Sequence, residues 1–355
     1  MKAINSGHSF RRIGYPWHSR VSSYINKDIY SIRRRLIGGA VFGSLLAFGP
    51  RVRAQASQKI VRIGVMAGKS DSAYKASFAA TLAALGWIEG KNLIIEWRQV
   101  DQPADVAGHA AALMALRPDV LVTAGPRITQ EIAKLTTAIP IVFLAVADPV
   151  KLGVVRSLPF PGGNLTGFQT VASNAYVGKL LQLLMEVAPG TTRIGMLIAT
   201  GNEMHKGGAE RAKPFATQLH ASVTALNVDK AEALEGAFDA GSREGVQALL
   251  VPGDLLFSAT RERIAALAIK HRLPSIFMFP YYVDAGGLLS YGISVDALFR
   301  SAAGTVNKIL KGARPQDIPV EQPTRFEMVI NLKTARALGL KISQAVLLRA
   351  DRVIE

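Results

Sequence analysis

Residues 139–167 read IPIVFLAVADPVKLGVVRSLPFPGGNLTG, and this stretch decides the fold. Its apolar run at 141–145 has the length and composition of a strand that is buried on both faces, as in a parallel sheet. Asp148 and Pro149 then stand where an N-cap and a first-turn proline would open a helical segment. Open α/β sheets bind small ligands just past the carboxyl ends of their strands. The stretch therefore predicts an α/β protein with a ligand site at that edge.

The same alternation extends to both sides of this stretch. Apolar runs of strand length alternate with segments of helical periodicity over residues 59–145 and again over 176–279, and residues 164–167 predict a turn followed by a strand. The two series open on similar sequences, RIGVM at Arg62 and RIGML at Arg193. Alternating β and α units predict parallel sheets covered by helices and joined by right-handed crossovers. We therefore expect two Rossmann-like lobes.

The C-terminal part of the chain adds segments that come too late to belong to one lobe. Strand-like runs at 288–293 and 326–332 flank a helical segment at 295–310. They predict that the chain crosses back between the lobes and forms a multi-strand hinge. A cleft between two lobes is a favoured place for a ligand. The expected ranges are 57–166 with 285–317 for the N-terminal lobe, and 167–284 with 318–355 for the C-terminal lobe.

The charge of the chain is concentrated at its start. The 355 residues have a formal net charge of +16, and residues 1–56 contain ten lysines and arginines but one acid, Asp28. The remainder has no basic run and no arginine–aromatic interleaving, so we do not expect nucleic-acid binding. The chain has no cysteine. Disulfides, thiolate metal sites, a cysteine nucleophile and a lipobox anchor are thereby excluded.

Residues 33–56 have the three parts of a secretory signal peptide. Three arginines at 33–35 precede an apolar run at 36–49, and Ala54-Gln55-Ala56 follows as a cleavage site. The run is shorter than the roughly 20 residues of a membrane span, although an uncleaved anchor is the alternative reading. The arginines also permit twin-arginine export. We expect residues 1–56 to be removed by cleavage near Ala56, and the mature protein to lie in the periplasm.

The motifs of catalysis are missing or misspaced. Gly64 to Ser70 reads GVMAGKS, in which three residues separate the glycines where a phosphate loop needs four. The histidines do not have metal-ligand spacing, and no G-x-S-x-G nucleophile elbow occurs. We therefore expect no cofactor, no metal site and no enzymatic activity.

Several separate blocks resemble one protein family. They are GWIEGKN at 86–92, IPIVF at 139–143, ADPV at 147–150, PGGNLTG at 161–167, GGLLSYG at 286–292, ILKG at 309–312 and DIPVE at 317–321. In this order they are similar to ABC transporter substrate-binding proteins of the tryptophan/tyrosine-binding type. The resemblance covers almost the whole mature chain. It implies a type I periplasmic-binding fold, an extracytoplasmic location, and delivery of a small solute to a membrane permease that an ATPase drives.

An amino-acid-like ligand needs donors for its carboxylate and an acceptor for its ammonium group. Thr123, Ala124 and Gly125 follow a predicted strand and precede a helix, which suits a carboxylate. Asp254 follows the strand run at 246–251 of the second lobe and would take the ammonium group. Asp148 also faces the predicted cleft. A plain helix cap or hinge hydrogen bond is the alternative role for each aspartate.

Other residues are expected to line the same cleft. Lys69 and Ser70 follow the first strand, and Asn202 follows the first strand of the second lobe. Tyr281 and Tyr282 would stack on an apolar or aromatic side chain, with ordinary packing as the alternative. Arg127 stands where relatives tend to have small residues, and its charge favours an acidic ligand over an aromatic amino acid.

We expect the ligand to be captured when the lobes close about the hinge. The protein would be a monomeric receptor that passes its solute to a permease and an ATPase. A sensory protein of the same fold, presenting its closed form to a membrane receptor, is the alternative. The partner would distinguish the two.

Overall fold

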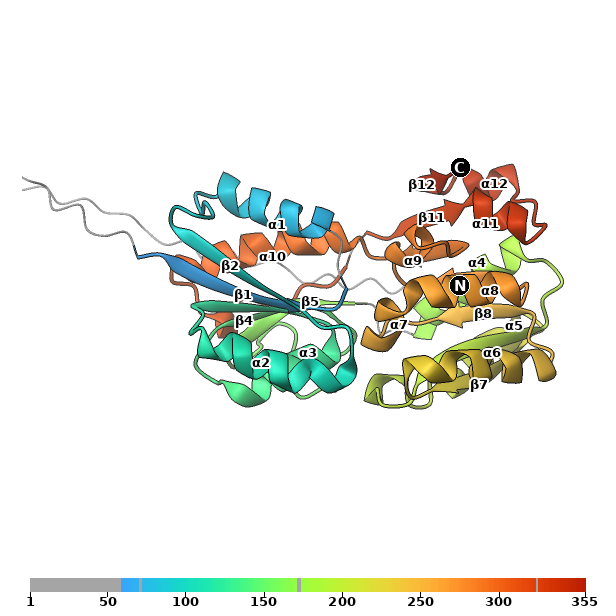
Figure 1. Ribbon diagram of the computed structural model, residues 1–355, viewed down its shortest axis with the longest axis horizontal. Coiled ribbons are helices and arrows are strands. Elements are labelled where there is room, and N and C mark those ends of the chain that lie inside the picture. Colours follow the sequence, from blue (N-terminus) through green and yellow to red (C-terminus); the bar gives the residue numbers. More distant parts are fainter. Residues whose placement is uncertain (1–58, 70–71, 171–173, 324) are drawn as a thin grey trace, which may run out of the picture. The chain divides into compact units, whose positions relative to one another are not determined.

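The computed structural model describes residues 59–69, 72–170, 174–323 and 325–355 (Figure 1). They lie in one compact unit, Gln55–Glu355. The predicted signal peptide at 33–56 falls outside the described residues. Within the described part of the chain, no helix is long and apolar enough to cross a membrane.

The first lobe is built on a five-stranded sheet in the order β2-β1-β3-β4-β5. Every neighbouring pair in this sheet is parallel. All five strands therefore end at the same edge, as the alternation predicts. The strands are β1 (Val61–Ala67), β2 (Leu93–Gln99), β3 (Val120–Ala124), β4 (Ile141–Val146) and β5 (Leu165–Gln169).

Helices cover both faces of this sheet, which explains why its strands are apolar on both sides (Figure 1). α1 (Ser72–Ala84) lies beside α10 (Val295–Leu310) on one face, where Phe78 and Phe299 meet edge to face. η1 (Pro103–Asp105), α2 (Val106–Ala115) and α3 (Pro126–Leu135) lie on the other side. The first lobe thus includes α10, a helix from the C-terminal part of the chain.

The second lobe has a seven-stranded sheet in the order β12-β11-β10-β9-β8-β6-β7. Only the β10–β11 pair is antiparallel, because the chain returns there from the first lobe. The strands are β6 (Arg193–Ala199), β7 (Ser222–Val228), β8 (Ala248–Val251), β9 (Ser275–Phe277), β10 (Leu289–Gly292), β11 (Glu327–Asn331) and β12 (Arg352–Ile354).

Two sets of helices cover the second sheet. One core contains side chains of α4 (Asn174–Val187), α5 (Gly208–Gln218), α11 (Leu332–Ala337) and α12 (Gln344–Leu347). Another contains side chains of α6 (Leu234–Arg243), α7 (Leu255–Ala259), α8 (Arg261–Lys270) and α9 (Tyr281–Asp284). Three short turns of 3₁₀-helix complete the described elements, η2 (Glu203–His205), η3 (Ala231–Ala233) and η4 (Pro315–Asp317).

Three connections join the lobes and confirm the predicted hinge. The chain passes from β5 to α4, from β10 to α10, and from η4 to β11. On the last passage Glu321 pairs with the end of β5, where its N–H donates to the Gly167 carbonyl at 2.9 Å. The predicted lobe boundary at residue 285 would place β10 in the first lobe, but β10 belongs to the second sheet. The predicted boundary after residue 166 likewise falls inside β5, which belongs to the first sheet and ends at Gln169.

The segment after β4 corrects one expectation. Asp148 and Pro149 open a turn rather than a helix, in which Leu152 N–H donates to the Asp148 carbonyl at 2.9 Å. Gly153 then adopts a φ of 77°, a left-handed conformation that ends a helical turn. Asp148 still caps this turn, since its Oδ1 accepts the Lys151 N–H at 3.0 Å.

Gly167, in the PGGNLTG block, has no room for a side chain. Its φ is 154°, and a Cβ atom there would lie 2.0 Å from the Phe143 carbonyl oxygen of β4. We expect Gly167→Ala to lower the free energy of unfolding by more than about 2 kcal/mol, because backbone strain and a backbone clash combine. Urea unfolding measures this change.

Gly163, four residues earlier, is the matched control. A Cβ atom at Gly163 meets nothing within 4 Å, and its φ is not in the left-handed region. Gly163→Ala should change the unfolding free energy by less than about 0.5 kcal/mol. Equal effects at the two glycines would contradict the steric explanation.

Candidate ligand-binding site

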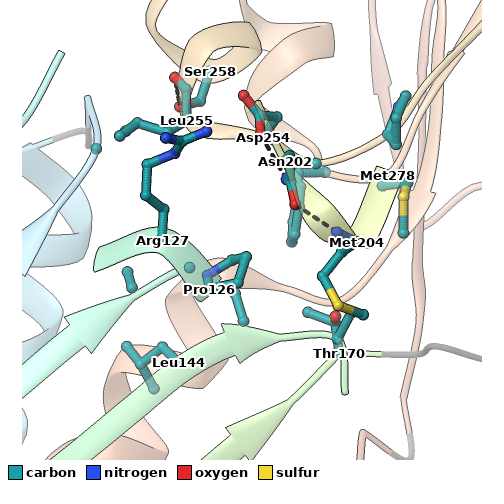
Figure 2. A pocket seen from close by; sticks show the side chains of 18 of the residues that line it. Pro126, Arg127, Leu144, Thr170, Asn202, Met204, Asp254, Leu255, Ser258 and Met278 are labelled. Carbon is teal, nitrogen blue, oxygen red and sulfur yellow. Dashed lines mark hydrogen bonds between the residues drawn. The ribbon is translucent and has the colours of Figure 1, made fainter. Parts of the chain in front are cut away.

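A cavity of about 350 Å³ lies at the carboxyl ends of strands from both sheets (Figure 2). The first lobe contributes the residues that follow β1, β3, β4 and β5, and the second lobe those that follow β6, β8 and β9. Val295, Leu298 and Phe299 of α10 complete the wall. This is the place where parallel α/β sheets bind small molecules, and its volume is that of a small-ligand pocket.

The start of α3 forms one polar side of the cavity. Gly125 precedes the helix with a φ of 91°, and Pro126 occupies the first helical position. The N–H groups of a first helical turn have no acceptor within the helix, so they are available to an anion. Thr129 holds this start in place, because its Oγ1 donates to the Gly125 carbonyl at 2.8 Å.

Arg127 extends from the first turn of α3 toward the second lobe (Figure 2). Its Nη2 donates to the Gly201 carbonyl in the loop after β6, at 2.5 Å. A guanidinium group carries five N–H donors, and Arg127 uses one of them among the described residues. The remaining donors leave Arg127 able to bind a carboxylate while it also joins the two lobes.

Asn202 and Asp254 form the opposite polar side. Asn202 Nδ2 donates to Asp254 Oδ2 at 2.7 Å, and Asn202 Oδ1 accepts the Met204 N–H at 3.0 Å (Figure 2). Asp254 Oδ1 accepts the Leu256 N–H at 2.7 Å, so Asp254 caps α7 as well as lining the cavity. Each carboxylate oxygen has a further lone pair. The capping role and a contact with a ligand ammonium group are therefore compatible.

His205 lies behind this corner in a fixed tautomer. Its Nδ1 accepts the Ala199 N–H at 3.1 Å, and its Nε2 lies 3.1 Å from the Gly253 carbonyl. Because a backbone N–H can only donate and a carbonyl can only accept, Nδ1 is unprotonated and Nε2 carries the hydrogen. Burial lowers the pKa of His205 and outweighs the opposing charge of Asp254. The ring is thus neutral, and it holds the loops after β6 and β8 together.

The rest of the cavity is largely apolar and aromatic. Tyr281 stacks on Phe279, with their ring centroids 5.4 Å apart. Methionine side chains adapt to ligands of different shape, and three of them face the cavity from the second lobe. The apolar and aromatic lining includes Tyr74, Leu144, Tyr176, Met196, Met204, Met278, Phe279, Tyr281, Val295, Leu298 and Phe299.

Most of the residues predicted from sequence lie on this cavity. The cavity is lined by Lys69, Ala124, Gly125, Asp148, Asn202, Asp254 and Tyr281. Thr123 is instead buried below it, with its hydroxyl 2.8 Å from that of Thr129. Tyr282 is buried in the core, where it stacks on Phe277. Ser70 falls outside the described residues, and contact of any of these with a ligand stays a prediction.

Most of the apolar wall could not be predicted from the sequence. Residues of α10 reach the cavity from the far end of the chain, and no local pattern marks them as ligand contacts. Met204 and His205 follow Asn202 closely, but the histidine has no metal-ligand spacing to single it out. Among the described residues, no group of three histidine or acidic side chains could hold a metal ion.

The neutral state of His205 predicts a pH dependence of stability. Because its pKa in the folded chain lies below the ordinary value of 6.5, the unfolded chain binds the proton more readily. Stability should therefore fall as the pH drops below about 6.5, down to the folded-state pKa. His205→Gln keeps one hydrogen-bond acceptor and one donor on the side chain but cannot titrate. Between pH 7 and pH 5, the melting temperature of the His205→Gln variant should fall by less than that of the unsubstituted protein. An equal fall in the melting temperatures of the two proteins would contradict the lowered pKa of His205.

Three comparisons with known proteins identify the family of this chain. The family model of the ABC transporter substrate binding protein matches residues 61–354. A tyrosine-binding protein of Clostridioides difficile (strain R20291) is 26% identical over 269 residues, which cover 75% of this chain and 76% of that protein.

Two solved structures are similar in fold and sequence. A conserved domain protein from Vibrio cholerae O1 biovar El Tor has a TM-score of 0.76 and 27% identity, covering 83% of this chain and 100% of the other. An ABC domain from Streptococcus pneumoniae in complex with L-Trp has a TM-score of 0.75 and 25% identity, covering 83% and 99%. The match over nearly all described residues, together with the two-lobed α/β architecture, shows that the chain belongs to the ABC transporter substrate-binding protein family.

Proposed function

We propose that this protein is the extracytoplasmic solute-binding component of an ABC importer and that it captures an amino acid with a large uncharged side chain. The observation that carries the proposal is the division of the cavity into a polar end and an apolar chamber. The proposal is supported by two relatives, one called tyrosine-binding and one solved in complex with L-Trp.

The polar end matches the two charges of an α-amino acid. The first turn of α3 and the guanidinium group of Arg127 would hold the carboxylate. Asp254, kept in place by Asn202, would accept from the ammonium group. Arg127 favours an acidic group at this position, and the α-carboxylate of any amino acid meets that need. An aromatic side chain is therefore compatible with Arg127, contrary to the preference for an acidic solute that its charge suggested.

The mechanism follows from the position of these groups on two lobes. Arg127 and α3 belong to the first lobe, whereas Asp254 and Asn202 belong to the second. A ligand that contacts both sets stabilises the closed arrangement by its differential affinity for it. The closed form would then dock on the permease and release the solute for transport driven by the ATPase.

The first test is thermal unfolding of the purified protein against the common amino acids, after denaturation and refolding to remove any bound ligand. Ligand that binds the native state alone raises the melting temperature in a saturable way. We expect the largest rise with tryptophan, tyrosine or phenylalanine, and little rise with lysine or aspartate. A rise confined to sugars or dicarboxylates would contradict the proposed ligand class. Loss of uptake of the identified amino acid in a deletion strain would test the importer role.

Asp254 gives a more specific prediction. Asp254→Asn keeps the size of the side chain but removes the charge that would face the ammonium group. A hydrogen bond to a charged group contributes about 1.5–3 kcal/mol, so we expect affinity for the amino acid to fall about 10- to 150-fold in calorimetric titration. Affinity for the same compound without its amino group should change much less.

Asp229 provides the control for this substitution. It is exposed at the end of β7 and does not line the cavity. Asp229→Asn should leave both affinities unchanged. If Asp254→Asn weakened the amino acid and its deaminated analogue equally, Asp254 would be a structural cap without a direct contact to the ligand.

A further inference from the structure

A second contact between the lobes lies beside the cavity, on the loop that follows β1. Arg261 Nη1 donates to the Lys69 carbonyl at 2.9 Å, and Lys69 Nζ lies 2.8 Å from Glu262 Oε1. Lys69 belongs to the first lobe, and Arg261 and Glu262 open α8 of the second lobe. These three residues, with Gly68, are called the clasp below.

Gly68 lets the loop after β1 lie close to side chains of the second lobe. A Cβ atom at Gly68 would lie 2.9 Å from Leu255 Cδ1 and 3.2 Å from Ser258 Oγ, both in the second lobe. The surfaces are therefore in close contact here, and the hydrogen bond to the Lys69 carbonyl forms within that contact.

Arg261 also contacts residues of its own lobe. Its side chain is 8% exposed, and its guanidinium group lies 5.7 Å from the centre of the Tyr281 ring. A buried guanidinium group stacked on an aromatic ring loses little further freedom when it forms one more hydrogen bond. Arg261 is thus a preorganised donor for the carbonyl of the opposite lobe.

Glu262 adds an ion pair at the rim of this contact. Burial by itself would raise the pKa of Glu262, but the hydrogen bond from Lys69 and the charges of Arg261 and Lys69 leave the pKa below its ordinary value. The carboxylate is therefore ionised at neutral pH. The Lys69 and Glu262 side chains are 39% and 52% exposed, so water and salt screen the attraction.

Only the two first-lobe residues of the clasp line the cavity. Gly68 and Lys69 line the cavity, whereas Arg261 and Glu262 do not. Glu262 therefore reaches the cavity through Lys69, whereas Arg261 contacts both the Lys69 carbonyl and the ring of Tyr281, which lines the cavity. Where a binding-competent conformation is partly populated, apparent affinity falls with that fraction.

We propose that Arg261 and Glu262 are positioning residues that set ligand affinity from outside the cavity, by holding residues 68–69 of the opposite lobe in the binding-competent closed arrangement. The proposal rests on the proposed function, because it assumes that the cavity binds its ligand in the closed form. It assigns a role in affinity to two side chains that make no contact with the ligand.

The test is Glu262→Gln, which removes the ion pair and keeps the size of the side chain. With L-tryptophan as the probe, we expect the dissociation constant at low ionic strength to rise about two- to fivefold, the range for a partly exposed ion pair. The rise should come from faster dissociation. At 1 M salt, where the Debye length is about 3 Å, the ratio of the two dissociation constants should approach one.

Glu235→Gln is a closely matched control. Glu235 pairs with Arg263 at 3.1 Å, with side-chain exposures of 58% and 39%, but both residues lie in the second lobe. This variant should bind L-tryptophan as the unsubstituted protein does, and both variants should unfold at nearly the same temperature. An equal loss of affinity in the two variants would overturn the proposal.

A distance measurement tests the clasp without any ligand. The chain has no cysteine, so Gln102→Cys and Lys230→Cys give two unique labelling sites, one exposed beyond the end of β2 and one beyond the end of β7. Spin-label distances should shift toward longer values when Glu262→Gln is added to this pair, and not when Glu235→Gln is added.

The two readouts separate the two proposals. If the unsubstituted protein binds L-tryptophan while Glu262→Gln changes neither its affinity nor the distances, the clasp proposal fails and the proposed function stands. If the protein binds none of tryptophan, tyrosine and phenylalanine, the proposed ligand class fails. The spin-label distances in the ligand-free protein then test the clasp proposal without the affinity measurement. Distances that Glu262→Gln leaves unchanged would overturn the clasp proposal.

Discussion

The hydrogen bond from Asn202 to Asp254 joins the loops after β6 and β8, two strands that are neighbours in the second sheet. It is possible because neighbouring parallel strands end at the same edge, so residues 52 positions apart in sequence come within 2.7 Å. The same constraint applies in the first sheet, where the ends of β1, β3, β4 and β5 all reach the cavity. Parallel topology thus brings together polar groups that are far apart in the chain, and apolar side chains line the rest of the cavity.

The residues of the polar corner are hydrogen-bonded to one another and to the backbone without a ligand. Asp254 accepts from Asn202 and from the Leu256 N–H, and His205 bonds to backbone groups on both sides. A carboxylate held in this way costs little to reorganise when a ligand arrives, which is the advantage of a preorganised site. Arg127 differs in that its hydrogen bond among the described residues joins it to the opposite lobe. In the proposed mechanism it is the group whose partners change most when the lobes separate.

The sequence predicts the architecture well because strands buried on both faces must be apolar, and residues 141–145 show this directly. It predicts the cavity less well. Thr123 and Tyr282 are one residue away from positions that line the cavity, and the direction of one side chain decides between cavity and core. Asp148 has the sequence of a helix start, but the left-handed Gly153 limits the segment to a turn. Arg261 lies 192 positions from its partner Lys69, and no local pattern encodes such a pair.

The strength of the contacts between the lobes bears on how such a receptor would work. The Lys69–Glu262 pair is partly exposed, and a pair of this kind contributes at most about 1 kcal/mol. Shifting an equilibrium from 1:99 to 99:1 requires about 5.5 kcal/mol. The Lys69–Glu262 pair therefore cannot account for such a shift by itself, but it can change the midpoint of the equilibrium. In the proposed mechanism, a ligand that bridges Arg127 and Asp254 and packs against the apolar wall would supply the rest of the difference.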